Sequence, residues 1–558
     1  MIRPIDLLRQ GRKEELWQMC CGFIDLSMEQ FMDIQKALLL EQIELLKNCE
    51  LGRKIMREAM PATVEEFREM VPLTNYGAYL PELANKNENN LPAKVARWIR
   101  TSGHAGTYDA KWVPISEDFM AEFEKVAGGM AIFCTCNDRF DLSHIKEHQK
   151  ALHMIADVGQ ASGFLCDLIR QALGYDMLPS NADNLSFQER IRAGFDEAMY
   201  QGLDAFGGLS SVLVAIGEQF KQKKEKTNVK PLLSHPKALF RITRGLIRSK
   251  LARRQMLPKD LWSIKGIGGG GTDNTVFKTK VKELWGRYPL ELYAGTEGGI
   301  YATQTWDYEG MTFIPTLDFF EFIPEREWFK WQLDHSYQPK TILLDEVEAG
   351  ENYELVITNF HGGIMTRYRP GDMIRIISLR NDKLDINIPQ MVFERRSDEL
   401  IDISGFGRMT EKVIWQAVEN TGVPYVDWTA RKEGLKNKPI MHLYIELKDN
   451  YINSEKNIAA AVWDELIKLD NVYHYNIYGA YGAPENILGI KPLTVTLLPQ
   501  GAFARYIIQQ QNEGADLGNL KPPHINPSDK TISLLGTPGV VVKEVPLKEA
   551  AHSTTGTN

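Results

Sequence analysis

The chain has 558 residues, which is too many for a single hydrophobic core, so we expect two or more domains. Its composition, 43% hydrophobic and 25% charged, is that of an ordinary globular protein, and its net charge of -8 argues against a dedicated nucleic-acid binder. No stretch reaches the roughly 18 uninterrupted apolar residues of a membrane span, the N-terminus carries no secretory signal, and the six cysteines form no CxxC pair, so we expect a cytoplasmic protein with reduced thiols.

The first predicted elements are helices. Residues 14–70 carry apolar side chains at three- and four-residue spacing, the pattern of amphipathic helices. Further on, "RWIRTSGHAGTYDAKWVPIS" has an apolar start, a small-residue loop over Thr101–Lys111 and a β-like end. Clustered backbone N–H groups and hydroxyls in such a loop can hold phosphate oxygens, although an ordinary turn has a similar composition.

Helical patterns dominate residues 117–260. Within them, "HIKEH" (His144–His148) matches the H-x-x-E-H spacing of one class of zinc peptidases. So short a pattern arises easily by chance, and nothing else in the chain indicates a peptidase. We therefore expect a histidine pair at the surface or at the edge of the core here rather than a zinc site.

The pattern changes at residue 261, where a strand, a glycine loop, a helix and a second strand are predicted in succession. This order is one βαβ unit and implies a parallel sheet. The glycines match G-x-G-x-x-G (Gly266–Gly271), but Glu291 enters the second strand instead of leaving it, which argues against a dinucleotide site. We expect a loop, including Gly269 and Gly270, that lets backbone approach a flat base or a phosphate; a bare turn is the alternative.

Two acidic residues then occur in short segments that contain glycine. "YAGTEGGIYATQTW" (Tyr293–Trp306) places one carboxylate, Glu297, in a small-residue loop. Short β-runs occupy residues 311–395, and among them "RYRPGD" (Arg367–Asp372) places an acid just before a strand. A carboxylate in that setting can accept hydrogen bonds from both hydroxyls of a ribose, although Pro-Gly-Asp is also a common turn.

A domain boundary is predicted next to "RRSDELIDISG", where a charged segment precedes a new helix. We expect a large domain over residues 1–397 and a smaller α+β domain over 398–558, with a disordered tail.

The order of these pieces resembles the adenylate-forming superfamily, which includes acyl-CoA synthetases, nonribosomal adenylation domains and firefly luciferase. "YAGTE" resembles its Tyr-Gly-x-Thr-Glu motif, and "RRSDELIDISG" resembles its interdomain joint. "FERRSDELIDISG" and "GAFARYIIQQQNEGADLGNLKPP" are similar to segments of the plant auxin-responsive Gretchen Hagen family of acyl acid amido synthetases. The resemblance implies an α/β fold: a large multi-layer domain with sheets flanked by helices, plus a mobile α+β domain.

The resemblance also implies an ATP- and magnesium-dependent ligase. Such an enzyme activates a small carboxylic acid as an acyl-adenylate, releases pyrophosphate and transfers the acyl group to an amine, here expected to be an amino acid. By motif position, Glu297 would hold Mg²⁺, Asp372 would bind the ribose, and Lys521 would stabilise charge on the α-phosphate. The other implied contacts are Tyr293 against adenine, Ala294 and Gly295 beside the nucleotide, Thr296 at the α-phosphate, Arg396 at ribose or phosphate, and a hinge at Asp398.

The first loop departs from the family pattern. Matching members read Ser-Ser-Gly-Thr-Ser-x-Gly before a lysine, whereas this chain has His104 and Ala105 at the Thr and Ser positions. The candidate ATP contacts in this loop are Thr101, Ser102, Gly103 and Thr107.

Two alternatives stay open at this point. One is an acid–CoA ligase that forms a thioester, and the other is a non-catalytic nucleotide-binding scaffold. The acid itself is not readable from the sequence. Its pocket is expected between residues 117–260 and the strands after 300, where Tyr301, Trp306 and Phe313 either face the substrate or belong to the core.

Overall fold

The computed structural model describes residues 2–100, 111–153, 161–181, 185, 187–222, 235–270, 274–396, 400–403, 407–435, 438–448, 451–473, 493–512 and 521–536. The chain forms two compact units, Met1–Ser397 and Asp398–Asn558. The predicted disordered tail, the loop Thr101–Ala110 and the predicted hinge at Asp398 lie outside the described residues.

The first unit is built on an eleven-stranded mixed sheet with the strand order β10-β11-β12-β13-β9-β8-β7-β6-β5-β3-β4. Strands β7, β6, β5, β3 and β4 are mutually parallel, and the pairs from β7 to β10 are antiparallel. The strands are β3 (Lys150–His153), β4 (Asp176–Leu178), β5 (Ala205–Leu209), β6 (Gly266–Gly270), β7 (Leu290–Gly295), β8 (Gly299–Thr303), β9 (Met311–Phe313), β10 (Asp318–Pro324), β11 (Asn352–Asn359), β12 (Asp372–Ser378) and β13 (Gln390–Arg396). A separate antiparallel pair, β1 (Val95–Arg100) and β2 (Trp112–Ser116), flanks the Thr101–Ala110 loop.

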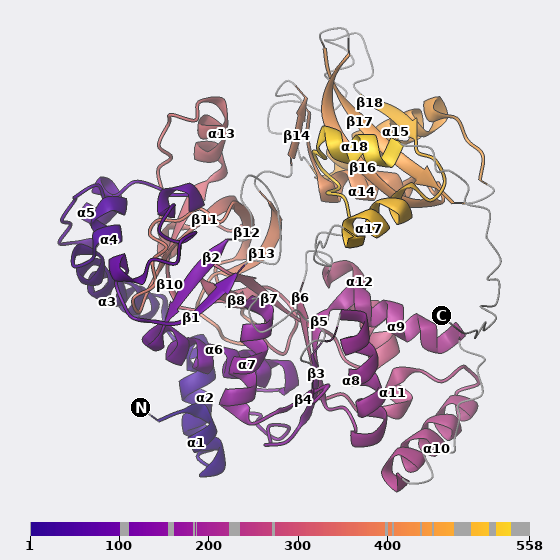
Figure 1. Ribbon diagram of the computed structural model, residues 1–558, viewed down its shortest axis with the longest axis horizontal. Helices are drawn as coiled ribbons and strands as arrows, with labels where there is room; N and C mark the ends of the chain where they lie inside the picture. The colour runs from indigo at the N-terminus through magenta and orange to yellow at the C-terminus, as the bar shows by residue number, and fades with distance from the viewer. Residues whose placement is uncertain are drawn as a thin grey trace, which may run out of the picture. The chain divides into compact units, whose positions relative to one another are not determined.

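Helices cover both faces of the parallel strands, with α6 and α7 on one side and α8 and α9 on the other (Figure 1). The α-helices of this unit are α1 (Pro4–Arg9), α2 (Lys13–Cys21), α3 (Met28–Lys47), α4 (Glu50–Ile55), α5 (Val64–Met70), α6 (Glu117–Thr135), α7 (Ala161–Leu173), α8 (Phe187–Gln201), α9 (Ser210–Gln222), α10 (Pro236–Leu251), α11 (Pro258–Leu261), α12 (Asn274–Trp285) and α13 (Glu325–Leu333). Short 3₁₀ turns lie at Gly22–Asp25, Tyr76–Tyr79, Glu88–Asn90 and Leu344–Glu346.

The predicted α/β architecture is confirmed, with two local differences. The βαβ unit is present as β6-α12-β7, but the glycines expected to form a loop are themselves the first strand, β6. Residues 117–260, expected to be mainly helical, also contain β3, β4 and β5. These strands are only three to five residues long, so their pattern is lost among the longer helical ones.

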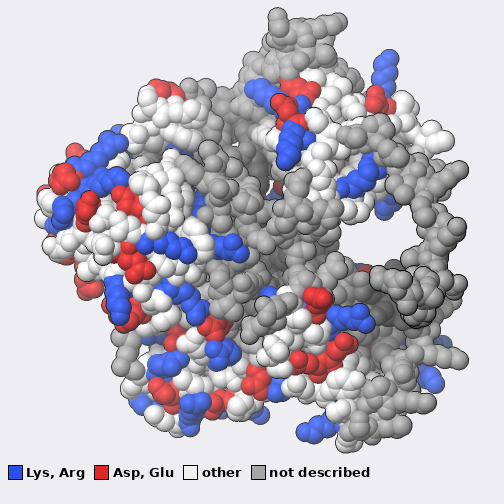
Figure 2. Space-filling view, viewed as in Figure 1, with Lys and Arg blue, Asp and Glu red and all other residues white. Residues whose placement is uncertain are grey.

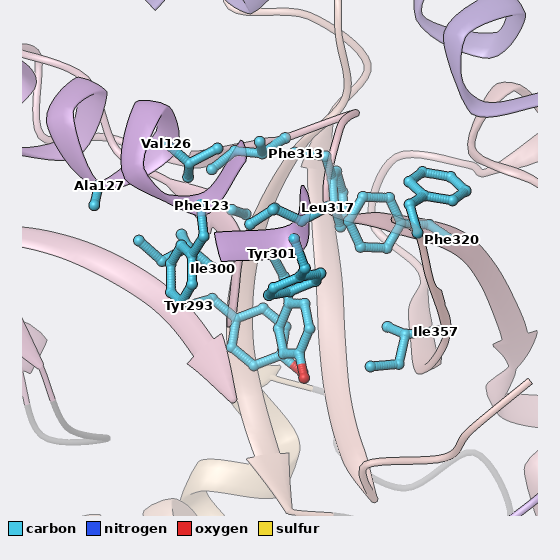
Figure 3. Close-up of a cluster of buried hydrophobic side chains, with 14 of the residues drawn as sticks. Phe123, Val126, Ala127, Tyr293, Ile300, Tyr301, Phe313, Leu317, Phe320 and Ile357 are labelled. Atoms are coloured by element: carbon cyan, nitrogen blue, oxygen red, sulfur yellow. The ribbon is translucent and has the colours of Figure 1, made fainter. Parts of the chain in front are cut away.

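Helix α6 connects the two halves of the core. Ser116 directly precedes it, and its hydroxyl accepts a hydrogen bond from the Phe119 N–H at 3.0 Å and so caps the helix. Along its buried face, Phe123, Val126 and Ala127 pack with side chains from the antiparallel strands (Figure 3). Tyr301 and Phe313, two of the residues considered for the acid pocket, are fully buried members of this core.

Strand β10 is the edge of the sheet, and α3 covers it with buried glutamines. The Gln35 amide donates to the carbonyls of Pro315 and Asp318 and accepts from the Phe320 N–H at 2.9 Å. Farther along the helix, the Gln42 amide exchanges hydrogen bonds with the backbone of Gly362 and Gly363. These side chains satisfy backbone groups that a neighbouring strand would otherwise pair.

The second unit is a small α+β domain with its own hydrophobic core. Strands β16 (Tyr425–Leu435) and β17 (Lys438–Leu447) are antiparallel, and β18 (Leu493–Leu497) pairs with β17 in parallel. The other elements are β14 (Leu400–Ile403), β15 (Gly407–Thr410), α14 (Glu411–Asn420), α15 (Glu455–Tyr473), α17 (Ala502–Asn512) and α18 (Asp529–Gly536). The parallel β17–β18 pair is connected through α15, whose Trp463 and Leu466 are buried in this core.

Acidic and basic side chains are interspersed over the N-terminal helices α3 to α5 on the face in view (Figure 2). None of the helices that the structure describes is both long enough and apolar enough to cross a membrane.

Candidate functional site

The turn between β7 and β8 lies where the sheet changes from parallel to antiparallel pairing. Gly295, the last residue of β7, pairs with Gly299, the first of β8, so Thr296, Glu297 and Gly298 form the turn itself. Gly299 has a φ of +82°, a conformation that favours glycine. In open α/β sheets, ligands bind beyond the carboxyl ends of parallel strands at such a change of direction.

The Glu297 carboxylate is held by two side chains that are distant in sequence. The Tyr368 hydroxyl donates to Glu297 Oε1 at 3.0 Å, and the Lys111 ammonium lies 3.4 Å from the same oxygen. Lys111 Nζ also lies 3.3 Å from the Tyr368 hydroxyl, so the three groups meet at one point. The Glu297 side chain is only 11% exposed, and the adjacent ammonium compensates its charge.

Buried polar side chains hold the backbone of this turn in place through hydrogen bonds. The Asn359 amide donates to the Glu297 carbonyl at 3.0 Å and to Asp318 Oδ1 at 2.7 Å. A Cβ on Gly298 would lie 2.8 Å from both carboxylate oxygens of Asp318, so only glycine fits above that acid. Burial raises the pKa of Asp318 well above its usual range, which favours a neutral carboxyl group beneath the turn.

Two buried ion pairs position the "RYRPGD" segment. Arg367 makes a two-point contact with Glu321, at 2.9 and 2.8 Å, and Arg369 does the same with Glu354, at 3.0 and 2.6 Å. Both acids are almost fully buried, so each pair fixes its stretch of backbone. Tyr368, which lies between the two arginines, is thereby placed beside Glu297.

Asp372 starts strand β12 directly after Gly371, which has a φ of +83°. Its Oδ2 accepts a hydrogen bond from the Tyr293 hydroxyl at 2.9 Å. The Tyr293 ring is nearly buried and packs against Phe393, with ring centroids 5.8 Å apart. The backbone of Arg396 pairs with that of Asp372 across β12 and β13, and the arginine side chain lies outside the described residues.

The structure therefore brings together Tyr293, Glu297 and Asp372, three of the predicted site residues. Gly269 and Gly270 end the neighbouring strand β6, and Ala294, Gly295 and Thr296 belong to the end of β7 and its turn. Thr101, Ser102, Gly103 and Thr107 lie outside the described residues, as does the hinge residue Asp398.

Sequence reasoning did not identify Lys111, Tyr368 and Asn359 as site residues. Lys111 directly follows the small-residue loop, and Tyr368 lies within the recognised "RYRPGD" motif, so both had a usable signal. Asn359 lies in a strand-like run, and nothing in its sequence surroundings distinguishes it from other strand ends.

Lys521 belongs to the second unit, where its ammonium lies 3.3 Å from Asp427 Oδ2 and its side chain is 68% exposed. The segment after it docks on β16: the Ala430 N–H donates to the His524 carbonyl at 2.7 Å, and the Asn526 N–H donates to the Ala430 carbonyl at 2.8 Å. This docking leaves the ammonium accessible while the backbone next to it is fixed.

The His524 ring, which is 13% exposed, anchors the same segment. It contacts Glu411 at 2.6 Å through Nδ1 and Asp427 at 2.9 Å through Nε2, and it stacks on Trp428 with ring centroids 4.6 Å apart. Burial lowers the pKa of His524, but the hydrogen bonds to the two carboxylates outweigh it and raise the pKa to about 9.

The described residues of the first unit suit a Mg²⁺ ion that is bound together with a nucleotide. Among the described residues, no group of three or more His, Cys, Asp or Glu side chains could hold a metal ion. A Mg²⁺ ion that is bound with a nucleotide takes one or two carboxylates, with phosphate oxygens and water completing its ligands. The single carboxylate of Glu297 at the β7–β8 turn suits that arrangement.

The overall fold matches solved structures of adenylate-forming enzymes. An acyl acid amido synthetase, AtGH3.15 in complex with 2,4-DB, superposes with a TM-score of 0.62 at 16% identity and covers 92% of this chain and 95% of its own. A 2-hydroxyisobutyryl-CoA ligase in the postadenylation state gives a TM-score of 0.58 at 12% identity and covers 91% of both chains. The chain therefore has the fold of the adenylate-forming enzymes.

Sequence comparison narrows this class. Residues 20–157 match the GH3 family N-terminal domain, and residues 311–396 match the GH3 family central domain. The chain belongs to the GH3 family, as its motifs had indicated.

Curated relatives match only parts of the chain. A 4-substituted benzoates–glutamate ligase, GH3.12 of Arabidopsis thaliana, is 28% identical over 245 residues, which are 40% of this chain and 38% of the relative. The jasmonoyl–L-amino acid synthetase JAR4 of Nicotiana attenuata is 35% identical over 146 residues, 25% of this chain and 23% of the relative. The chain thus spans well under half the length of these curated relatives.

Proposed function

We propose that this protein activates a carboxylic acid with ATP and transfers the acyl group to an amine, with an amino acid as the acceptor. The observation that carries the proposal is the convergence of Glu297, Lys111 and Tyr368 at the turn after β7, together with the hydrogen bond from Tyr293 on β7 to Asp372 at the start of β12. This place in a mixed sheet is where nucleotides bind in open α/β folds. Membership of the GH3 family supports the same chemistry.

The first step joins the acid to the nucleotide. A carboxylate oxygen of the substrate forms a bond to the α-phosphorus, the bond from that phosphorus to the β-phosphate oxygen breaks, and pyrophosphate leaves. In the second step, the amine nitrogen forms a bond to the acyl carbon, AMP leaves with the bonding electron pair, and the amine proton passes to solvent.

In this proposal the residues of the first unit bind the nucleotide. Asp372 accepts the ribose hydroxyls, Thr296 contacts the α-phosphate, and Glu297 would hold Mg²⁺, whose charge would neutralise the phosphates. Lys111 adds a second positive charge beside Glu297. The remaining proposed contacts are Tyr293 at the base, the backbone of Gly269, Gly270, Ala294 and Gly295, the loop residues Thr101, Ser102, Gly103 and Thr107, and Arg396.

The second unit is proposed to supply Lys521. Its ammonium would stabilise the negative charge that grows on the α-phosphate oxygens during carboxylate attack, which requires a donor aimed at that charge. The exposure of this side chain and the fixed backbone after it support the assignment. A hinge at Asp398 would let the small unit change position between the two steps.

An amino acid is the acceptor that the relatives favour. The matching relatives are named for conjugating benzoates with glutamate or jasmonate with amino acids. A thioester-forming ligase is the alternative product class, since the fold is shared with a CoA ligase. The plant acids themselves are not proposed as substrates of this chain.

Pyrophosphate release tests the proposal directly. The full chain is incubated with ATP, Mg²⁺ and pooled carboxylic acids, with an amino acid mixture, with CoA, or with neither. Acid-dependent release that the amino acids stimulate supports the amide-forming reaction, whereas stimulation by CoA alone would transfer the assignment to a thioester former. ATP binding without any acid-dependent release would refute catalysis.

The magnesium assignment has its own control. Glu297→Gln is expected to raise the Mg²⁺ concentration for half-maximal release by at least about 10-fold, because a metal contact is lost. Glu309→Gln removes an exposed carboxylate that pairs with Lys383 and should leave the magnesium titration unchanged. Identical titrations for the wild type and Glu297→Gln would contradict a metal contact at this residue.

A further inference from the structure

A second candidate site lies inside the first unit, away from the β7–β8 turn. A cavity of about 50 Å³ separates α6 and α7 from the face of the parallel strands. Its walls are mostly small or apolar residues, among them Cys134 on α6, Cys166 on α7, Gly207 on β5 and Gly268 on β6. Tyr175, just before β4, lines one end of the cavity.

Glycines form part of the sheet face that borders this cavity. Side chains alternate along a strand, and Gly266 and Gly268 of β6, which both line the cavity, have no side chain to fill it. Gly207 of β5 pairs with Gly268, so these neighbouring positions on two adjacent strands both lack a side chain. Glycine weakens a central strand, and such a strand often marks a place where a ligand approaches closely.

Helix packing explains only one of these glycines. A Cβ on Gly266 would lie 2.8 Å from Thr135 Cγ2, so α6 rests directly on the strand there. A Cβ on Gly207 would meet no atom within 4 Å, and one on Gly268 would be 3.6 Å from the Cys134 sulfur. The space beside Gly207 is therefore open, and a Cβ on Gly268 would make only an ordinary contact.

Tyr175 provides a polar group at the end of the cavity. The residue is 3% exposed, and its hydroxyl has no hydrogen-bond partner in the part of the chain that the structure describes. Tyr175 also borders a surface hollow of about 1200 Å³, so it stands between that hollow and the cavity. A buried hydroxyl without a partner is energetically costly, and a ligand atom would satisfy it.

The cavity has room for the end of a substrate's acyl chain but not for a whole substrate. At about 10–15 Å³ for each water-sized group, the cavity of about 50 Å³ holds about three to five heavy atoms. Strand β6 runs from Gly266 to Gly270, four residue steps or about 13 Å, toward the carboxyl edge of the sheet next to β7.

We propose that this cavity receives the far end of the acyl substrate and that the Tyr175 hydroxyl binds a polar atom there. The inference rests on the proposed function, which places the substrate carboxylate at the carboxyl edge of the sheet. It assigns a substrate class: carboxylic acids with an apolar chain of medium length that carries a hydroxyl or carbonyl group at its distal end. The two cysteines take no chemical part, because burial raises the pKa of Cys134 and of Cys166 to about 12.

Two variants test this site. Gly207→Val fills the open space, and it suits both the surrounding room and a strand conformation. Tyr175→Phe removes only the hydroxyl. Tyr308→Phe is the matched control, because Tyr308 is another largely buried tyrosine and does not line the cavity.

The assay measures acid-dependent pyrophosphate release with acetate, octanoate and 8-hydroxyoctanoate. The wild type should prefer 8-hydroxyoctanoate over octanoate by about 10-fold in kcat/KM, and Tyr175→Phe should lose that preference. Gly207→Val should reduce kcat/KM for both long acids by at least about 10-fold and leave acetate unaffected. Tyr308→Phe should behave like the wild type.

The outcomes separate the two proposals. If neither Gly207→Val nor Tyr175→Phe changes the activation of the long acids, the cavity assignment is overturned while the ligase function stands. If no acid supports pyrophosphate release, the ligase function fails, and calorimetric binding of 8-hydroxyoctanoate decides the cavity separately. Binding that Gly207→Val abolishes supports the site, whereas absent binding, or equal binding by both proteins, overturns it.

Discussion

The stability of the second unit should depend on pH through His524. The ring is positively charged at neutral pH, since contacts with Asp427 and Glu411 raise its pKa from 6.5 to about 9. A difference of about 2.5 pKa units corresponds to about 3 kcal/mol of folding free energy. Because the pKa of the folded state is the higher one, this stabilisation is complete below pH 6.5 and is lost as pH rises to 9.

The effect can be isolated by comparing the wild type with His524→Gln in the full chain. Urea unfolding would be followed through the ¹⁹F signal of 5-fluorotryptophan at Trp428, whose ring stacks on His524. The difference in unfolding free energy between the two proteins should shrink by about 3 kcal/mol from pH 6 to pH 9.5.

His335→Gln, which removes an exposed histidine of the first unit, should show no such dependence. A wild-type advantage over His524→Gln that stays constant between pH 6 and pH 9.5 would refute a charged, doubly paired imidazole.

Three further substitutions follow from the site. Lys521→Ala should slow adenylation by about 3 to 4 kcal/mol, or about 10² to 10³ in rate, and leave ATP affinity nearly unchanged. Gly298→Ala places a Cβ 2.8 Å from both Asp318 oxygens and should destabilise the first unit by about 1–3 kcal/mol in urea unfolding. Asn359→Ala frees the Glu297 carbonyl and should cost about 1–3 kcal/mol in stability while raising the Mg²⁺ requirement of pyrophosphate release.

Matched variants control for general damage. Lys530→Ala removes another lysine of the second unit and should retain full adenylation. Asn381→Ala breaks a side-chain bond to Asp307 instead of one to the turn, so the Mg²⁺ requirement should stay at the wild-type value. Equal effects of Asn359→Ala and Asn381→Ala on that requirement would contradict a special role for Asn359.

Much of the fold could be predicted because the motifs occur at recognisable element ends. The α/β architecture, the GH3 family and the β6-α12-β7 unit are confirmed. The sequence predicts a loop where β6 lies, because four of the five residues of this strand are glycines, which are depleted in strands. Its pairing with β5 and β7 overrides that local preference, and no single-residue signal reports such pairing.

Some residues of the candidate site could also be predicted from the sequence, and others could not. Tyr293, Glu297 and Asp372 could be selected because each lies in a short motif next to glycine. Lys111 contacts Glu297 across 186 positions of sequence, and Asn359 reaches the same turn across 62. Contacts over such separations depend on how the strands are ordered in the sheet, which local patterns do not encode. The chemical roles of all these residues remain predictions.

The glutamines of α3 have a practical consequence for anyone who trims this chain. Gln35 and Gln42 form hydrogen bonds that an additional strand would otherwise make, since they occupy backbone donors and acceptors at β10 and at the turn that follows β11. A fragment that starts after α3 would leave backbone N–H and C=O groups unpaired at this edge of the sheet. Other chains could pair with these groups, so we expect the fragment to precipitate or to assemble into higher-order species. Expression boundaries should therefore retain the N-terminal helices even where only the later part of the first unit is wanted.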